Sequence, residues 1–223
     1  MPAATARKKR AVVHVDSPPR VIINDPPKVE IPPLPPWHGL RVKMTREEFE
    51  ARDWKEGDAA RWKFEWNDGF AEAYEERMRL SEIKFMRRLP NAFAASPHGK
   101  QGAEMFCEVE IWLNKRQMRI PDLCVLTEAQ IEFADEGGLP VPGFVIEVLS
   151  PSDQIMHVQS KVGEYFAAGV KVVWHVHRAF KTVTIYTGPT DAEIKHDHDI
   201  CSAAPAFPKF KMKASDIFAA AKL

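Results

Sequence analysis

The chain has 223 residues, of which 45% are hydrophobic and 28% are charged, a composition typical of a soluble globular protein. Its 31 basic and 31 acidic residues balance, so no excess of positive charge indicates nucleic acid as a partner. No apolar run reaches the roughly 18–20 residues of a membrane span, and the basic N-terminus lacks the apolar segment of a secretory signal. These features exclude membrane, secreted and fibrous proteins.

The cysteines are far apart in the sequence and lack the C-x-x-C spacing of metal and redox sites. Three cysteines cannot all pair, and cysteine is often buried as a small apolar residue. We therefore expect reduced, buried thiols in a cytoplasmic protein, at Cys107, Cys124 and Cys201.

Proline is concentrated near the N-terminus, where it occupies eight of the nineteen positions from Pro18 to Pro36. Proline fixes φ, lacks an N–H donor and favours extended geometry in the preceding residue. We therefore predict a disordered or extended arm over residues 1–43 and a folded domain over residues 44–223. The basic tip of the arm, residues 7–10, could contact nucleic acid or serve solubility alone.

Two local signals mark the start of the folded part. Thr45, followed three residues later by Glu48, matches the capping box that begins a helix. Strand-like runs over residues 61–66 and 70–74 flank Asn67-Asp68-Gly69. This turn sequence between two such runs predicts a β-hairpin.

Helical and strand periodicity alternate through the rest of the chain. Apolar residues at helical spacing predict a helix over 77–89, ended by Pro90, and a second helix over 154–168, ended by Gly169. The apolar side of the second helix would comprise Ile155, Val158, Val162, Tyr165 and Phe166. Alternating or continuous apolar runs predict five strands, over residues 106–113, 118–126, 143–149, 170–176 and 182–186.

Two carboxylates interrupt otherwise apolar predicted strands. Asp122 follows Pro121 in the segment RIPDLCVL, and Glu147 lies in the segment FVIEVL. A charge in a covered strand is costly unless it is paired or binds a metal. If the two strands are neighbours, the carboxylates converge, and paired oxygen ligands of this kind suit Mg²⁺.

Lys161 lies at the border of the apolar side of the predicted second helix, about 40° from Tyr165 at 100° per residue. Its stem can therefore follow the edge of the core while the ammonium group points to the sheet. Near a metal site, this group could orient a water molecule or hold a phosphate. A structural ion pair with Asp122 or Glu147 is the alternative.

The order of these motifs resembles that of the Uma-type restriction endonuclease family, within the PD-(D/E)XK nuclease superfamily. The matching pieces are Thr45–Phe49, Phe64–Gly69, Arg119–Asp122, Glu147–Ser152, Lys161, Tyr165, Gly169–Val170, Trp174 and Asp216–Phe218. Each piece is weak alone, but this many in order are specific. The resemblance implies an α/β fold with a restriction-endonuclease-like mixed β-sheet flanked by helices, extended by an N-terminal β-hairpin.

The resemblance also implies a metal-dependent endonuclease that hydrolyses DNA phosphodiester bonds. Asp122 and Glu147 would bind Mg²⁺ or Mn²⁺, and the Val148 carbonyl would add a ligand. RNA is an alternative substrate, and a homodimer is an alternative to a monomer because many site-specific nucleases act as dimers.

The lysine that usually follows the superfamily's glutamate by two residues is absent, because that position holds Leu149. The resemblance implies that Lys161 replaces it, in agreement with its place on the helix. Glu65, in the hairpin motif, would be a further catalytic residue. Glu82, on the first predicted helix, would be an additional acid.

The chain departs from the family pattern at three polar positions, one of which is near Ser81 and Glu82, where the first predicted helix lacks the expected histidine. His157 stands where the family has an acidic residue before the lysine, and His177 stands near the usual Trp-x-x-Asp aspartate. Each change removes a polar partner from the site. The alternative function is therefore a catalytically degenerate nuclease fold that binds nucleic acid or protein without cutting.

Charge is unevenly distributed along the sequence. Residues 45–76 hold five basic and eleven acidic residues, whereas residues 77–119 hold nine basic and four acidic ones. The basic stretch could meet phosphates through Arg77, Arg79, Arg87, Arg88, Lys115, Arg116 and Arg119. A solvated helix face is the alternative interpretation.

Overall fold

The structure is a computed structural model that describes residues 41–52, 62–75, 80–149 and 155–219. All of these residues belong to one compact unit, which extends from Pro33 to Leu223. The arm predicted over residues 1–43 lies outside the described residues, apart from the short strand β1 (Arg41–Lys43). In the described part of the chain, no helix is both long and apolar enough to cross a membrane.

A five-stranded antiparallel sheet has the order β1-β3-β2-β6-β5. Its other strands are β2 (Trp62–Asn67), β3 (Phe70–Glu75), β5 (Ile111–Asn114) and β6 (Gln117–Arg119). The predicted hairpin is confirmed, because β2 and β3 pair around Asp68 and Gly69. Their φ angles of 51° and 83° are the left-handed values that a tight two-residue turn needs. The predicted capping box, Thr45 with Glu48, begins α1 (Arg46–Glu50).

A six-stranded mixed sheet has the order β11-β10-β9-β8-β7-β4. Its strands are β4 (Glu104–Cys107), β7 (Leu123–Leu126), β8 (Phe144–Leu149), β9 (Val172–His177), β10 (Thr182–Tyr186) and β11 (Ala192–His196). The β8–β9 pair is parallel and the other neighbours are antiparallel. Strands β8 and β9 are central and apolar, as expected for strands that are covered on both faces.

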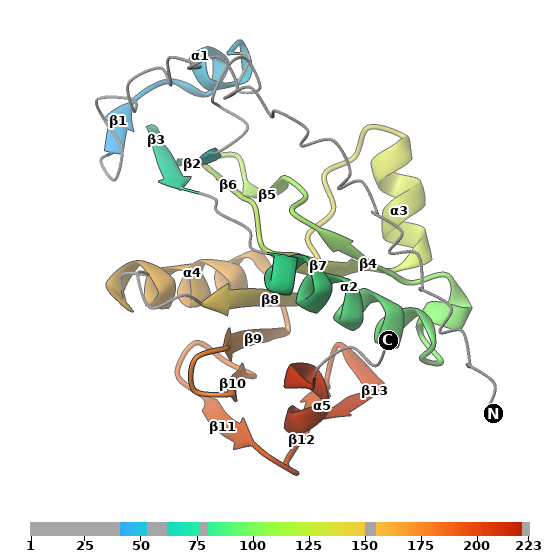
Figure 1. Cartoon of the computed structure of the whole chain (residues 1–223). Helices are drawn as coiled ribbons and strands as arrows, with labels where there is room; N and C mark the ends of the chain where they lie inside the picture. Colours follow the sequence, from blue (N-terminus) through green and yellow to red (C-terminus); the bar gives the residue numbers. More distant parts are fainter. Residues whose placement is uncertain (1–40, 53–61, 76–79, 150–154, 220–223) are drawn as a thin grey trace, which may run out of the picture. The chain divides into compact units, whose positions relative to one another are not determined.

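Apolar layers cover both faces of the six-stranded sheet (Figure 1). The remaining elements are α2 (Leu80–Ala94), a 3₁₀ turn (Gly99–Gln101), α3 (Glu128–Asp135), α4 (Ile155–Ala168), β12 (Ile200–Ala203), β13 (Phe207–Lys213) and α5 (Ala214–Phe218). On one face, α2, α5 and the β12–β13 pair share a core with Phe144 and Trp174. On the other face, α4 and β5 share a core with Val145 and Val173, through Tyr165 and Ile111.

Helix α2 continues through Pro90, so the prediction that this proline ends the helix is wrong. The helix extends to Ala94 because Leu89 and Phe93 lie on its core face, fully buried. Burial of these side chains offsets the cost of the proline, which removes one backbone hydrogen bond and crowds the carbonyl one turn earlier.

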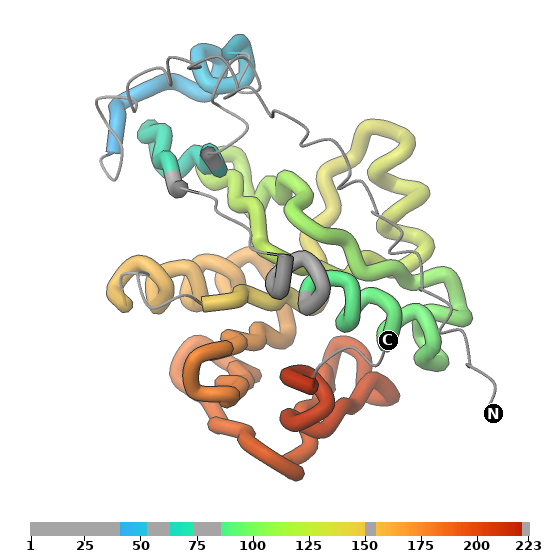
Figure 2. The backbone as a smooth tube through the Cα atoms, viewed as in Figure 1, coloured from blue at the N-terminus to red at the C-terminus, as the bar shows by residue number. Residues whose placement is uncertain are grey.

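Two of the predicted strands are each divided between the two sheets, so both predictions of a single strand are wrong. The run 106–113 is divided into β4 and β5 at Glu108, whose φ of 52° breaks the extended backbone. The run 118–126 is divided into β6 and β7 at Pro121, where the backbone N–H needed for a ladder is missing. Figure 2 shows this light-green part of the chain passing from one sheet to the other and back.

The predicted second helix is confirmed as α4, and Gly169 ends it with a left-handed φ of 107°. The strands predicted over 143–149, 170–176 and 182–186 are confirmed as β8, β9 and β10. The prediction for Ile155 is wrong, because its side chain is 83% exposed at the first residue of the helix. The expectation of a buried thiol is wrong for Cys107, which is exposed, and correct for the other two cysteines.

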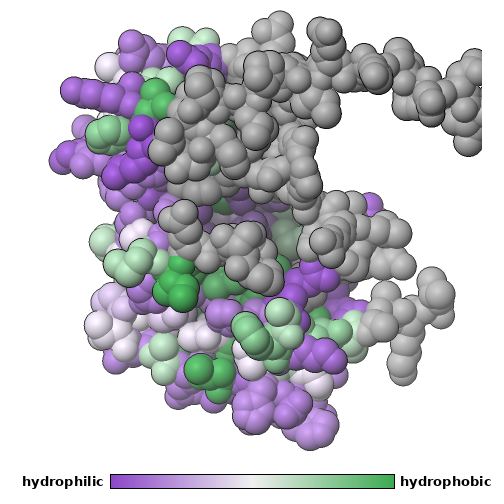
Figure 3. All heavy atoms as spheres, turned by 60° about the vertical axis from the view of Figure 1, so that its left-hand side comes forward, coloured by the Kyte–Doolittle hydropathy of each residue, from purple (hydrophilic) through white to green (hydrophobic). Residues whose placement is uncertain are grey.

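Apolar side chains reach the surface at separate positions rather than in one patch on the face that Figure 3 shows. The exposed large apolar residues are Phe133, Leu139, Ile155, Met156, Phe180, Ile194 and Ile200. They come from different elements and from turns. Scattered exposure of this kind is normal for a globular surface.

Candidate functional site

Strand β2 brings charged side chains toward the second sheet because its residues alternate between two environments. Phe64 and Trp66 are buried in the apolar cluster of the five-stranded sheet. The alternate residues Lys63 and Glu65 therefore point the other way. Their contacts with Asp122 and with α4 place them where the two sheets and α4 meet.

Glu65 is fully buried, and hydrogen bonds from three groups surround its carboxylate. Its Oε1 accepts from Lys161 Nζ at 2.8 Å and from the Ile120 N–H at 3.1 Å, and its Oε2 accepts from Arg119 Nη1 at 3.0 Å. Burial alone would raise the pKa of Glu65, but Lys161 and Arg119 lower it to about 2. Glu65 is therefore a fixed anion that orients Lys161, and it is poorly suited to exchange protons near neutral pH.

Arg119 is buried among three carboxylates, so it is not available to meet phosphates as the sequence analysis expected. Its Nη1 lies 2.7 Å from Glu72 Oε2 as well as 3.0 Å from Glu65 Oε2. Its Nε and Nη2 bind the two oxygens of Glu164, on α4, at 2.8 and 3.1 Å. This bidentate geometry ties the five-stranded sheet to α4.

Asp122 and Glu147 are adjacent, as the sequence predicted for neighbouring strands. Leu123 pairs with Ile146 across β7 and β8, and each carboxylate lies one residue beyond that pair. The N–H of Val148 donates to Asp122 Oδ2 at 2.6 Å, which fixes the aspartate against β8.

Glu147 is buried in the second sheet, where the hydroxyl of Tyr165 donates to its Oε1 at 2.6 Å. Burial raises the pKa of Glu147, the nearby negative charge of Asp122 adds to this effect, and Lys161 opposes it. A nearby positive charge therefore stabilises the ionised form of Glu147.

Lys161 lies on α4 and is buried, with its ammonium group directed at the site. The ion pair described for it is with Glu65, at 2.8 Å. Sequence analysis did not suggest Glu65 as a partner, and it becomes one because the hairpin of the first sheet reaches α4. Lys161 also acts electrostatically on Glu147, which the sequence did suggest. Helical spacing also places Tyr165 one turn after Lys161, on the same side of the helix.

Lys63 is a residue of this cluster that sequence analysis missed. Its Nζ lies 3.1 Å from Asp122 Oδ1, across 59 positions of sequence. Burial by itself would lower the pKa of Lys63, but the carboxylates of Asp122 and Glu147 outweigh it and raise the pKa above its usual value. The alternation of β2 could have revealed Lys63, since it shares a side with Glu65.

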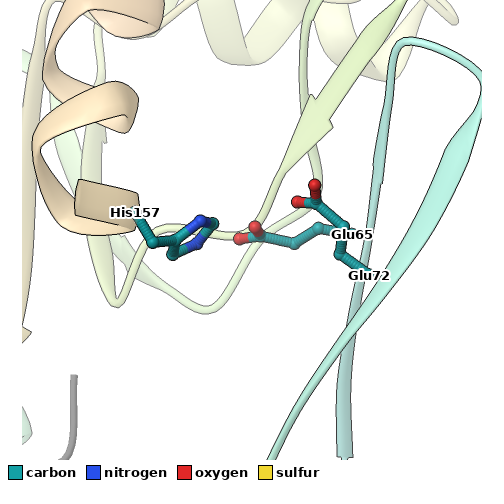
Figure 4. Close-up of side chains that lie close together, drawn as sticks. All are labelled: Glu65, Glu72 and His157. Atoms are coloured by element: carbon teal, nitrogen blue, oxygen red, sulfur yellow. The ribbon is translucent and has the colours of Figure 1, made fainter. Parts of the chain in front are cut away.

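Glu65, Glu72 and His157 form a second group of possible metal ligands, with one atom of each within 4.8 Å of the others. Figure 4 shows the two glutamates of β2 and β3 and the α4 histidine pointing toward one another. A metal could be held there, but Arg119 already neutralises both glutamates, and Arg41 Nε lies 3.0 Å from Glu72 Oε1. The carboxylate oxygens of this group are thus occupied by Arg41, Arg119, Lys161 and the Ile120 N–H.

His175 is a second residue that sequence analysis missed, and it lies beside Glu147 in the parallel pairing of β8 with β9. Its side chain is 2% exposed and packs edge to face on Tyr186, with ring centroids 4.8 Å apart. Burial lowers the pKa of His175 to about 4, so the imidazole is neutral at pH 7. No group among the described residues hydrogen-bonds its Nε2.

The remaining predicted residues have mixed outcomes. Glu82 lies on α2, where its side chain is outside the described residues, and Arg77 and Arg79 are outside them as well. Arg88 donates to the carbonyls of Asp216 and Ala219, and Arg116 pairs with Asp68. Arg87 and Lys115 are exposed. His177, at the end of β9, is half-buried next to Thr184.

Comparison with known proteins identifies the family and the fold of the chain. The model of the Uma2 family, described as "Putative restriction endonuclease", matches residues 46–215. A solved structure titled as a "putative nuclease belonging to DUF820", from Anabaena variabilis, superposes with a TM-score of 0.62 at 17% identity. The match covers 77% of this chain and 96% of that one and shows a shared fold. No curated protein matches the chain.

The family match extends from α1 to α5. Of the charged residues described above for the site, it leaves out Arg41 alone. It covers well over half of the sequence. The chain therefore belongs to the Uma2 family of restriction endonuclease-like proteins.

Proposed function

We propose that the protein is a Mg²⁺- or Mn²⁺-dependent endonuclease that hydrolyses DNA phosphodiester bonds. One observation carries the proposal: Asp122, just before β7, and Glu147, in β8, lie side by side in a largely buried position. Burial and the charge of Asp122 raise the pKa of Glu147, so a further positive charge would stabilise its ionised form. A divalent cation would supply it.

The donor set suits a hard cation. Carboxylate oxygens, a backbone carbonyl and water are the ligands that Mg²⁺ and Mn²⁺ take. Asp122 and Glu147 would hold the ion with the carbonyl of Val148. When bound, the ion would act as a Lewis acid on the scissile phosphate and the attacking water.

The neighbouring residues have complementary roles in this proposal. Lys161 would stabilise the negative charge that develops on the phosphate, and Glu65 is a positioning residue that holds the ammonium group of Lys161 at 2.8 Å. Tyr165 fixes the orientation of Glu147 through its hydroxyl. DNA is the proposed substrate because of the family's description as a restriction endonuclease, and RNA is the alternative.

A second candidate function is a binding module that retains the nuclease fold without cutting. The observation in its favour is that protein groups already neutralise much of the cluster: Lys63 pairs with Asp122, and Arg119 with Glu65. Leu149 also stands where the superfamily usually has a lysine. In this case the ion pairs would hold the sheets together rather than support hydrolysis.

A nicking assay on supercoiled plasmid at low salt, with Mg²⁺, Mn²⁺ or EDTA, separates the two functions. Asp122→Asn, Glu147→Gln and Lys161→Met should each lose metal-dependent nicking while keeping the wild-type circular dichroism spectrum. Glu110→Gln, which changes an exposed acid outside the cluster, is the matched control and should nick normally.

The absence of nicking by folded wild-type protein with either metal would favour the binding module. A parallel assay with labelled single-stranded and hairpin RNA assigns the substrate. Cleavage of RNA alone, lost in the same three variants, would keep the site and replace DNA as its substrate.

A further inference from the structure

The ammonium group of Lys63 contacts Oδ1 of Asp122, an oxygen that a metal bound at the proposed site would approach. The carboxylate has two oxygens, and the N–H of Val148 donates to Oδ2 at 2.6 Å. The other oxygen, Oδ1, is 3.1 Å from Lys63 Nζ. Both oxygens therefore have a partner within the chain.

The contact is built into the fold. Lys63 comes from β2 of the five-stranded sheet, and Asp122 lies at the start of β7 in the six-stranded sheet. Their side chains are only 12% and 23% exposed, so the ion pair is shielded from solvent. Screening by water and salt is weaker at such a position than for a surface pair.

A divalent cation and this ammonium group would compete for the negative charge of Oδ1 and repel one another there. Mg²⁺ approaches a carboxylate oxygen to about 2.1 Å, and Lys63 carries a positive charge at neutral pH. Two cations on one oxygen repel strongly in a partly buried site. Metal binding therefore requires the lysine to withdraw or the metal to bind more weakly.

We propose that Lys63 is a tethered competitor of the metal: its ammonium group neutralises Asp122 in the metal-free protein and leaves Oδ1 when a divalent cation binds. This inference rests on the proposed metal site of Asp122 and Glu147. Lys63 thus lowers the affinity of the site for metal and keeps the carboxylate pair stable without it. Once displaced, the ammonium group lies next to the metal site, where an anionic phosphate would attract it.

Direct titration of Mn²⁺ into the full-length protein without DNA tests the competition. Lys63→Met should bind Mn²⁺ about tenfold or more tightly than wild type, because the repulsion is removed. Lys63→Arg keeps the charge and should stay close to wild type. Lys211→Met, which removes an exposed lysine of β13, is the matched control and should not change the affinity.

Thermal unfolding supplies a second measurement that does not depend on heats of binding. In EDTA, Lys63→Met should melt below wild type, because Asp122 and Glu147 lose a shared cation. Saturating Mn²⁺ should raise its Tm more than that of wild type, since tighter binding stabilises the folded state more.

The outcomes separate this inference from the proposed function. If Asp122→Asn abolishes Mn²⁺ binding but Lys63→Met binds no more tightly than wild type, the competition is refuted and the metal site stands. If neither wild type nor folded Lys63→Met binds Mn²⁺ at millimolar concentration, both the competition and the metal site are refuted.

Discussion

Glu65 is a buried anion on which two buried cations depend. Its carboxylate is fully buried between Lys161 and Arg119. Glu65→Gln would leave both cations short of a counter-charge, and removing one member of a buried ion group costs about 3–5 kcal/mol. We therefore expect a loss of that size in the free energy of unfolding by urea. The exposed change Glu110→Gln should alter it by less than about 0.5 kcal/mol.

The same residue predicts a pH dependence. The pKa of Glu65 is about 2 in the folded protein and 4.5 ordinarily, so its contribution to stability is complete above pH 4.5 and is lost as the pH falls toward 2. The difference in stability between wild type and Glu65→Gln should therefore shrink below pH 4.5, by about 2 kcal/mol at pH 3. Urea unfolding at several pH values between 6 and 3 measures it. A constant difference would contradict the assigned environment.

His175 predicts a dependence in a separate pH range. The folded chain keeps this imidazole neutral down to about pH 4, whereas an unfolded histidine binds a proton below 6.5. Its effect on stability is therefore absent above pH 6.5 and becomes destabilising as the pH falls from 6.5 to 4.

His175→Leu tests this assignment. Removing the buried Nε2, which lacks a partner among the described residues, should stabilise the protein by about 1 kcal/mol at pH 7. The variant should also lose less stability than wild type between pH 6.5 and 4. Equal losses in both proteins would show that the imidazole becomes protonated in the folded state.

Among the elements, α2 contains a proline that its own backbone does not favour. Pro90 lies eleven residues into a fifteen-residue helix, where its ring replaces a hydrogen-bond donor. Pro90→Ala should restore the helical bond to the carbonyl of Met86 and raise the free energy of unfolding by about 1–3 kcal/mol. Chemical denaturation followed by circular dichroism measures this change. Destabilisation would mean that the proline ring packs favourably enough to offset its backbone cost.

Elements with a complete local signal could be predicted from the sequence. The hairpin turn, the Thr45 capping box and the apolar spacing of α4 with Gly169 each act within a few residues. The divisions at Glu108 and Pro121 could not be predicted, because apolar alternation continues across both of them. Which sheet a strand joins depends on partners that are distant in sequence. The continuation of α2 through Pro90 likewise depends on distant packing partners and not on the local sequence.

In the candidate site, too, the residues with a local sequence signal could be predicted and those that depend on distant partners could not. Asp122 and Glu147 could be identified because each charge interrupts an apolar strand, and Lys161 because of its place on the helix. The alternation of β2 could have identified Lys63, which shares a side with Glu65. The pairing of Lys63 with Asp122 and the burial of Arg119 among carboxylates could not be predicted, because the partners are distant in sequence. A basic residue beside an apolar strand indicates a phosphate contact as readily as a buried ion pair.

At the level of the molecule, the site lies where two sheets and α4 meet, so its residues depend on the docking of parts that are distant in sequence. Lys63–Asp122 joins the two sheets, and Arg119–Glu164 joins the first sheet to α4. The chain passes between the sheets at residues 108–110 and 120–122 (Figure 2). Substitutions in these ion pairs should therefore affect folding and metal binding together.

DNA binding by a chain with no net charge must come from local basic groups. Of the predicted contacts, Arg87 and Lys115 are exposed, whereas Arg88 and Arg116 are engaged within the chain. With EDTA to prevent cleavage, DNA affinity should fall as salt rises, because phosphate contacts release counterions. Removal of either exposed side chain should reduce the slope of log K against log salt by about one.

Fluorescence anisotropy with a labelled duplex measures this slope for Arg87→Ala and Lys115→Ala. Lys211→Ala, which changes an exposed lysine of β13 outside the predicted basic stretch, is the control. If all three proteins keep the wild-type slope, DNA does not bind through the described part of the basic stretch. A wild-type affinity that does not vary with salt would argue against phosphate contacts altogether, and hence against DNA as the substrate.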